Sequence, residues 1–413
     1  MNSQQELIPH LFRTEFRKIT TVLSKLMGIE HIEIAEDIAS DTFLAAAESW
    51  PYNGVPPNPT AWLYNVAKNK ARNYITRNHI FANKVARQIT HETQESQAIE
   101  IDLSDKNIND SQLQMLFAIC HPTITVEAQI GLALRILCGF GIDEIANAFL
   151  SNKETINKRL FRAKEKLRTE KVAIEFPDET AIRPRLDAVL RTLYLLFNEG
   201  YYSESQNTIL RNDLCLEAMR LSYLLIENES TNVPEVNALF ALMCFHASRF
   251  EARKDTNGEI ILYQDQDESL WNKALIEKGV YFLHKASQGS QLSKYHIEAS
   301  IGYWHTIKAD TPEKWENILH LYNQLLILEY SPIAALNRTF AVSKVHGKTI
   351  AIAKAEKLKL LDNPYYFTLL GELYKDIDVL KAKENFKKAY DLARTKADKQ
   401  VIQKQIETLQ KTP

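Results

Sequence analysis

The chain has few of the residues that interrupt helices or cross-link a fold. Its 413 residues include 12 glycines, 13 prolines and 4 cysteines. Glycine and proline are the residues least compatible with a helix interior, so their scarcity beside abundant Leu, Ala, Lys and Glu favours an all-helical protein. The cysteines are widely separated in apolar surroundings, which predicts reduced core residues rather than a disulfide framework or a CxxC metal site. They are Cys120, Cys138, Cys215 and Cys244.

Membrane and enzyme signals are lacking as well. The sequence shows no secretory leader and no apolar run long enough to span a bilayer, which favours the cytoplasm. It also shows no HExxH metal motif, no glycine-rich phosphate loop and no nucleophile motif. We therefore predict that the protein is not an enzyme and has no catalytic residues, no metal and no cofactor.

The net charge is close to zero, at -2, but the charges separate along the chain. Residues 61–87 carry six cations and no carboxylate, whereas residues 88–110 carry six carboxylates and a single lysine. A locally basic stretch can bind nucleic acid even when acidic residues elsewhere cancel its charge. The length of the chain, with 45% apolar residues, predicts two to four globular domains.

Residues 141–167 predict two short helices joined by a tight turn, which is the shape of a helix-turn-helix. In the second helix an apolar stripe recurs at helical spacing through Ile156, Leu160, Ala163 and Leu167. Ser151 and Glu154 have the spacing of a capping box and predict where this helix begins. Its polar face could enter a major groove through Lys153, Thr155, Asn157, Lys158 and Arg162. The alternative is an ordinary surface helix with solvated lysines.

A second informative helix is expected to begin at Asn58-Pro59-Thr60, after the loop of residues 51–59, which is rich in proline. Its polar side gathers cations and an amide, namely Lys68, Asn69, Lys70, Arg72 and Arg77. This mixture suits a nucleic-acid strand with unstacked bases, because cations follow the phosphates while amides and rings receive the bases.

Three stretches together resemble a sigma factor of the extracytoplasmic-function type, within the sigma-70 family. They are AEDIASDTFLAAAESW at residues 35–50, PTAWLYNVAKNKARNYITRN at 59–78 and EAQIGLALRILCGFGIDEIANAFLSNKETINKRLFRAKEKL at 127–167. The resemblance implies a protein that binds core RNA polymerase, recognises the -35 and -10 promoter elements and initiates transcription.

The resemblance also implies roles for individual residues. Polymerase docking would fall to Glu36, Asp37, Asp41, Thr42 and Phe43. The opened -10 strand would be held by Trp50, Asn53 and Asn69, with Lys68, Lys70, Arg72 and Arg77 on its backbone. The -35 duplex would meet Lys153, Thr155, Asn157, Lys158 and Arg162. The acidic linker would follow the polymerase channels, although it could also be a merely flexible solvated segment.

The resemblance to a minimal sigma factor ends near Lys171. The segments YLLFNEGY (194–201), ALMCFHASRFEARKD (241–255) and DQDESLW (265–271) resemble the subgroup with a long helical C-terminal extension, which implies regulation in cis. The expected domains are sigma region 2 at 7–79, an acidic linker at 80–110, sigma region 4 at 111–171, a helical extension domain at 181–287 and tetratricopeptide-like repeats at 291–411.

Within the extension, Arg249, Arg253, Asp265, Gln266 and Asp267 form a possible structural or regulatory cluster. Carboxylates there could bind a metal, but Arg beside Asp more often forms a structural ion pair. Further on, Thr311-Pro312, Ser331-Pro332 and Asn363-Pro364 each pair a capping residue with proline, which predicts three helix starts. Repeat-like spacing is carried by Leu370, Gly371, Tyr374, Ala382, Phe386 and Ala389.

Stacked helix pairs usually bind a protein or peptide, although these could simply pack against the DNA-binding domains. Two other functions are open from the sequence. One is a DNA-binding transcriptional regulator that uses the helix-turn-helix without core polymerase. The other is a metal-dependent enzyme centred on Asp265 and Asp267.

Overall fold

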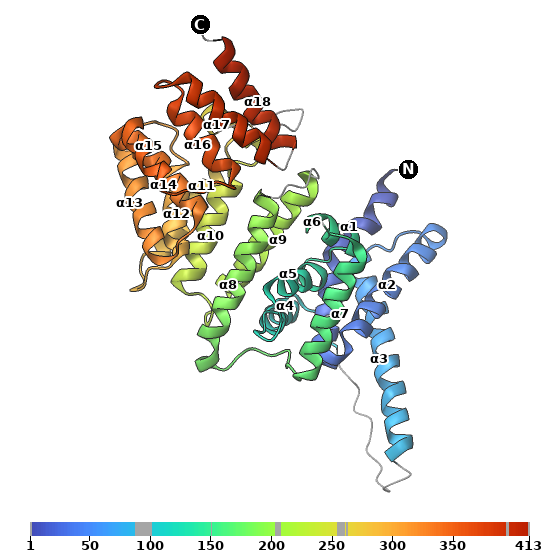
Figure 1. Cartoon of the computed structure of the whole chain (residues 1–413). Helices are drawn as coiled ribbons and strands as arrows, with labels where there is room; N and C mark the ends of the chain where they lie inside the picture. The colour runs from blue at the N-terminus through green and yellow to red at the C-terminus, as the bar shows by residue number, and fades with distance from the viewer. Residues whose placement is uncertain are drawn as a thin grey trace. The chain divides into compact units, whose positions relative to one another are not determined.

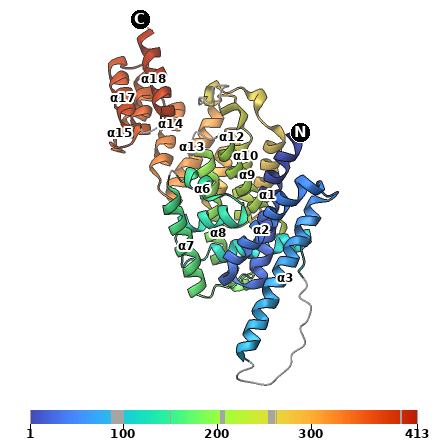
Figure 2. The same ribbon diagram turned by 90° about the vertical axis from the view of Figure 1, so that its right-hand side faces the viewer.

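A computed structural model (Figures 1 and 2) describes residues 2–86, 101–149, 151–202, 208–253, 261, 263–393 and 396–411. These described residues form helices and no strand, so the predicted all-helical fold class is confirmed. None of the helices described here is long and apolar enough to cross a membrane. The chain divides into two compact units. The first comprises Met1–Ser205 and Leu216–Thr231, and the second comprises Gln206–Cys215 and Asn232–Pro413.

The first unit begins with α1 (Asn2–Met27), η1 (Ile29–His31), α2 (Ile32–Asn53) and α3 (Pro59–Ala86). The expected break near Gly28 is confirmed, because this glycine has a φ of 91° that ends α1. The expected start of α3 is confirmed as well, and Asn58 caps it by accepting a hydrogen bond from the backbone N–H of Ala61 at 3.0 Å. Helix α2 continues two residues past Pro51 and ends at Gly54, whose φ is 80°.

The same unit continues with α4 (Asp105–Ile119), α5 (Val126–Leu132), η2 (Ala133–Leu137), α6 (Ile142–Ala148), α7 (Lys153–Thr169), α8 (Glu179–Tyr202) and the second half of α9 (Thr208–Glu227). The turn η2 extends α5 directly and is a π-helix, in which the N–H of Cys138 bonds to the carbonyl of Ala133 at 3.0 Å. Such π turns insert one extra residue into a helix.

The end of the expected acidic linker belongs to the core around α1, α2 and α3. Ile101, Leu103 and Ile108 are buried there with Phe16, Phe43 and other apolar side chains. Helix α4 begins within the linker, and Ser104 caps it by accepting a hydrogen bond from the N–H of Asn107. The acidic residues Glu92, Glu95 and Glu100 lie outside the described residues.

The second unit contains the first half of α9, α10 (Pro234–Ala247), η3 (Glu251–Arg253), η4 (Tyr263–Asp265), η5 (Glu268–Leu270), α11 (Lys273–Ala286), α12 (Lys294–Trp304), α13 (Pro312–Leu328), α14 (Pro332–His346), α15 (Lys348–Glu356), α16 (Pro364–Tyr374), α17 (Val379–Leu392) and α18 (Lys396–Lys411). From α10 onward, helices that are neighbours in sequence pack together, as Figure 1 shows for α16, α17 and α18. The three predicted proline starts are confirmed, and each has its capping side chain in place.

The pair α16 and α17 packs closely because of one glycine. A Cβ atom on Gly371 would lie 2.8 Å from the ring of Phe386, which is fully buried. The residues expected to carry repeat-like spacing therefore lie in a shared core, with Ala382 and Ala389 also completely buried.

Candidate nucleic-acid interface

Helix α3 presents amide and cationic side chains to solvent. Leu63, Ala67 and Ala71 recur every four residues and are fully buried, which fixes the side of the helix that faces the core. Asn69, Arg72 and Arg77 are exposed, and Lys68 and Lys70 are partly exposed. Lys70 lies 3.5 Å from Asp41 of α2. The residues expected to meet an opened DNA strand therefore remain accessible.

Trp50 does not share this surface. Its side chain is only 4% exposed, and its ring packs edge-on against Trp62 with 5.5 Å between centroids. The expectation that Trp50 contacts DNA is corrected here, because its ring is part of the hydrophobic core of α1, α2 and α3. Asn53, at the end of α2, is exposed as expected.

Helix α7 is the second polar surface, and Asn152 caps its start. The Asn152 side chain accepts a hydrogen bond from the N–H of Thr155 at 2.8 Å. The expected capping box of Ser151 and Glu154 is wrong by one residue, since the helix begins at Lys153. The predicted apolar stripe is confirmed: Ile156, Leu160, Ala163 and Leu167 are all buried.

Replacing Asn152 with alanine should lower the free energy of unfolding of the first unit by about 1 kcal/mol, because the N–H of Thr155 loses its acceptor. Ser151→Ala is the matched control and should change stability by less than about 0.5 kcal/mol. Urea unfolding of the full chain measures both. Equal losses of stability in the two variants would contradict the assignment of the cap to Asn152.

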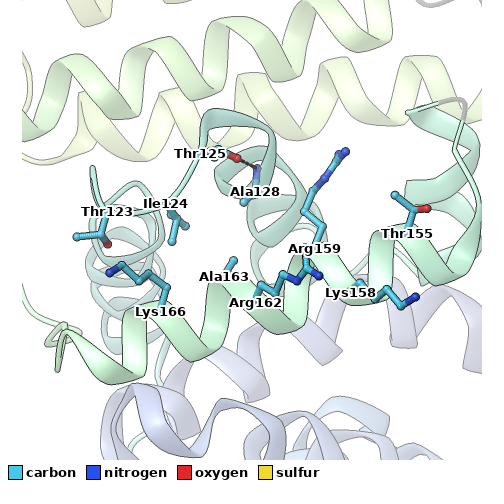
Figure 3. A pocket seen from close by; sticks show the side chains of 10 residues that line it. All are labelled: Thr123, Ile124, Thr125, Ala128, Thr155, Lys158, Arg159, Arg162, Ala163 and Lys166. Atoms are coloured by element: carbon cyan, nitrogen blue, oxygen red, sulfur yellow. Dashed lines mark hydrogen bonds between the residues drawn. The ribbon is translucent and has the colours of Figure 1, made fainter.

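All five side chains expected at the -35 duplex are exposed: Lys153, Thr155, Asn157, Lys158 and Arg162. Figure 3 shows a basic groove along this face of α7. The groove is lined by residues of the segment Thr123–Ala128 and, on α7, by Thr155, Lys158, Arg159, Arg162 and Lys166. The groove encloses about 470 Å³. It is suited to a phosphate backbone, because four cations surround it while the described lining contains no carboxylate.

The residues predicted from the sequence to contact DNA did not include Arg159, although it lines this groove. It is half-buried, with its guanidinium 5.6 Å from the ring centroid of Phe149. Its spacing from Thr155, Arg162 and Lys166 follows the helical period and could have placed it on the same face.

Glu36 of α2 lies in a buried ion-pair cluster against α7 and η2. Its carboxylate accepts hydrogen bonds from Lys164 at 2.5 Å and from Arg135 at 2.8 Å. At the edge of the cluster, Arg168 bonds to Glu33 at 2.8 Å. The side chains of Glu36 and Lys164 are each only 10% exposed. We call these five residues the Glu36 cluster. It joins the segment expected to dock on polymerase to the segment expected to bind DNA.

The other expected docking residues divide into two groups. Thr42 and Phe43 belong to the core: Thr42 bonds to the carbonyl of Ile38 at 2.7 Å, and Phe43 packs on Phe12 with 5.0 Å between ring centroids. Their expected contact with polymerase is corrected, because neither side chain reaches the surface. Asp37 and Asp41 are exposed as expected.

In the second unit, Asp265 and Asp267 are exposed, and Asp267 caps η5 by accepting a hydrogen bond from the N–H of Ser269 at 2.9 Å. Gln266 and Arg249 are buried, and Arg253 is partly buried. Within the described residues, no ion pair joins Arg249 to either aspartate, so the expected Arg–Asp pairing at this residue is wrong.

Two parts of the chain match known families. Residues 11–79, which cover most of α1 through α3, match Sigma-70 region 2. Residues 185–287 match a family of unknown function (DUF6596). Along nearly its whole length the chain is similar to Uncharacterized protein R00370 from Rhizobium meliloti (strain 1021), with 33% identity over 404 residues, 94% of this chain and 93% of the relative.

The chain belongs to the same family as this Rhizobium protein. Its N-terminal domain is sigma-70 region 2, which supports a sigma-70 family factor with a non-enzymatic role in polymerase binding and transcription initiation. The exposed face of α3 and the Glu36 cluster are therefore partly built from sigma-70 region 2. No solved structure matches the chain.

Proposed function

We propose that the chain is a sigma factor of the extracytoplasmic-function type that binds core RNA polymerase and directs it to promoters. The observation that carries the proposal is the exposed amide and cationic face of α3 within sigma-70 region 2. Asn69 can receive an unstacked base, while the nearby cations hold the backbone of the opened strand. A closed duplex would have no use for such a face.

In this proposal α6 and α7 act as a helix-turn-helix. The exposed start of α7 enters the major groove at the -35 element, and Lys158, Arg159, Arg162 and Lys166 hold the adjacent phosphates. Phosphate contacts position the helix, whereas Asn157 and Arg162 can read base edges.

The described arrangement of the first unit would be a closed form. Glu36 cannot face polymerase while Lys164 and Arg135 surround its carboxylate. Asp37 and Asp41 remain available for a first encounter. Full docking would therefore require α7 to separate from α2, which couples polymerase binding to release of the DNA-binding helix.

We also propose that the second unit regulates the first in cis, with its helix pairs offering a surface for a protein or peptide. The support is covalent attachment and the stacking of neighbouring helices described above.

The deciding experiment mixes the purified full chain with core RNA polymerase and maps transcription starts on genomic DNA. Co-purification with polymerase and discrete start sites would support the sigma function. Tight binding to closed duplex without polymerase would favour the alternative, a DNA-binding regulator that acts alone.

Within that assay, Arg77→Ala should weaken open-complex formation and reduce the slope of log affinity against log salt by about 0.7, because one phosphate contact to a single strand is lost. Arg77 is exposed on α3. Lys106→Ala, which removes an exposed cation from α4 of the same unit, should leave the slope unchanged. If the two variants gave equal salt slopes, Arg77 would make no contact with the DNA backbone.

A further inference from the structure

The second unit contains a buried arginine whose charge no described residue neutralises. Arg249 follows α10 directly and is only 8% exposed. The described residues offer its guanidinium no hydrogen bond and no ion pair, and its buried Nε has no acceptor. Its guanidinium lies over the ring of Tyr263, with 5.5 Å between Cζ and the ring centroid. Arginine stays protonated in proteins, so burying it without an anion is strongly unfavourable.

A second cation lies against the same ring. Lys314, at the start of α13, is almost completely buried, with its ammonium 5.1 Å from the Tyr263 centroid. It donates hydrogen bonds to Tyr263 Oη at 2.9 Å and to the carbonyl of Ile307 at 2.5 Å. Both acceptors are uncharged. Burial lowers the pKa of Lys314, although the carboxylate of Asp310 partly opposes this.

Nearby carboxylates are already engaged. Asp310 accepts hydrogen bonds from the indole N–H of Trp315 and from Lys344, the latter at 2.9 Å. Asp267 is exposed and occupied in capping η5. Neither forms an ion pair with Arg249 or Lys314, so within the described residues no carboxylate is paired with either buried cation.

Three more buried polar atoms around Tyr263 lack partners, and one of them is Nδ1 of His305, whose ring centroid lies 5.3 Å from that of Tyr263. The indole N–H of Trp271 and the Oε1 atom of Gln266 make no hydrogen bond, and both residues are about 5% exposed or less. The ring of Trp271 lies 6.2 Å from that of Tyr263. Lys308 fixes the Gln266 backbone by donating to its carbonyl. The site therefore offers unused donors and at least one unused acceptor.

We propose that Arg249, Tyr263, Gln266, Trp271 and Lys314, the Tyr263 cluster, bind a small oxyanion of the phosphate class that carries a hydroxyl group. Its charged oxygens accept hydrogen bonds from Arg249, from Trp271 and from the remaining N–H of Lys314. Its hydroxyl donates to Gln266 Oε1. The unpartnered atoms of Arg249, Trp271 and Gln266 thereby gain partners, and the charge of the anion compensates the two buried cations.

The site extends beyond the segment matched to the family of unknown function. Arg249 and Trp271 lie within residues 185–287, whereas Lys314 follows that segment by one helix. A bound anion would therefore link the matched segment to α13, and the second unit would respond to a small molecule. It does not depend on the sigma function.

The test titrates the full chain with inorganic phosphate, sulfate or chloride at constant ionic strength, and follows heat release and the unfolding temperature. Phosphate should bind saturably and raise the unfolding temperature. Sulfate, which has no hydroxyl at neutral pH, should bind at least tenfold more weakly. A wild-type chain that shows no saturable response to phosphate would overturn the proposal.

Arg249→Met should abolish the phosphate response while keeping or raising the unfolding temperature without phosphate, because it removes an uncompensated buried charge. Arg338→Met is the matched control. Its Nε donates to Asn323 Oδ1 at 2.5 Å, and it should keep the full response. Lys314→Met should also lose the response. If Arg249→Met retained phosphate binding, or if it destabilised the phosphate-free chain, Arg249 would have a structural role and the proposal would fail.

Discussion

Lys164→Ala should bind core RNA polymerase at least tenfold more tightly than the wild-type chain and should also unfold more easily. In the closed form the Lys164 ammonium lies 2.5 Å from Glu36, with both side chains largely shielded from water. Removing one member of a buried pair costs about 3–5 kcal/mol when the other charge is left unpaired, and because Glu36 keeps its bond to Arg135, Lys164→Ala should cost only part of that amount. Glu36 escapes this cost when α2 separates from α7 and water reaches it. Because 1.4 kcal/mol is a tenfold change in an equilibrium constant, even part of that cost shifts the population strongly toward the open form.

Polymerase binding is measured without DNA, so that a lost DNA contact cannot mask the gain, and unfolding is followed in urea. Lys166→Ala is the matched control, since Lys166 lies on the same helix but makes an exposed pair with Glu170 at 2.8 Å. It should change stability by less than about 0.5 kcal/mol. If Lys164→Ala lost stability but gained no affinity for polymerase, the Glu36 cluster would be structural only.

A chain cut after Lys171 should fail to fold, whereas a chain cut after Thr231 should remain folded. Helix α8 and the second half of α9 belong to the first unit. Thr192 of α8 is fully buried and donates to Gln129 of α5 at 2.9 Å, and Arg185 bonds to the carbonyl of Phe117. Arg220 of α9 bonds to Gln112 at 2.7 Å.

The early cut removes these contacts together with apolar side chains of α8. Each buried leucine contributes roughly 1.5–3 kcal/mol. Several such losses exceed the 5–15 kcal/mol that typically stabilises a whole domain. Circular dichroism and size-exclusion chromatography of both truncated chains test this. A soluble, helical chain ending at Lys171 would contradict it. Regulation by the second unit is therefore better tested by the cut after Thr231.

Local chemistry made the helix boundaries predictable. Pairs such as Thr311-Pro312 carry their own capping group and a fixed φ, so neighbours in sequence decide where the helix starts. The buried stripe of α7 was equally visible, because helical periodicity places Ile156 and Leu160 on one side. These features needed no knowledge of distant contacts.

Helical periodicity in α2 could also have prevented two errors. Thr42 and Phe43 follow Ala35, Ile38 and Ala39 on one apolar face, and the structure buries that face. Their expected docking role came from the family resemblance, which placed them on the surface. The same face continues to Trp50 at helical spacing.

The partners of Glu36 could not be predicted from sequence. Arg135 lies 99 residues away and Lys164 lies 128 residues away, in different helices. Residue type alone gives Glu36 the same surface preference as Asp37, and only tertiary packing distinguishes them. The unneutralised Arg249 is a similar case, because the sequence places Asp265 and Asp267 close by while the fold turns both toward solvent.

The π turn η2 makes the number of residues before α6 critical. Its residue Arg135 donates a hydrogen bond to Glu36, and the turn precedes both helices of the proposed DNA-binding motif. Deleting one residue there would restore a regular α-helix and rotate everything that follows by roughly 100° about its axis. Related sequences should therefore show substitutions in this stretch but few deletions.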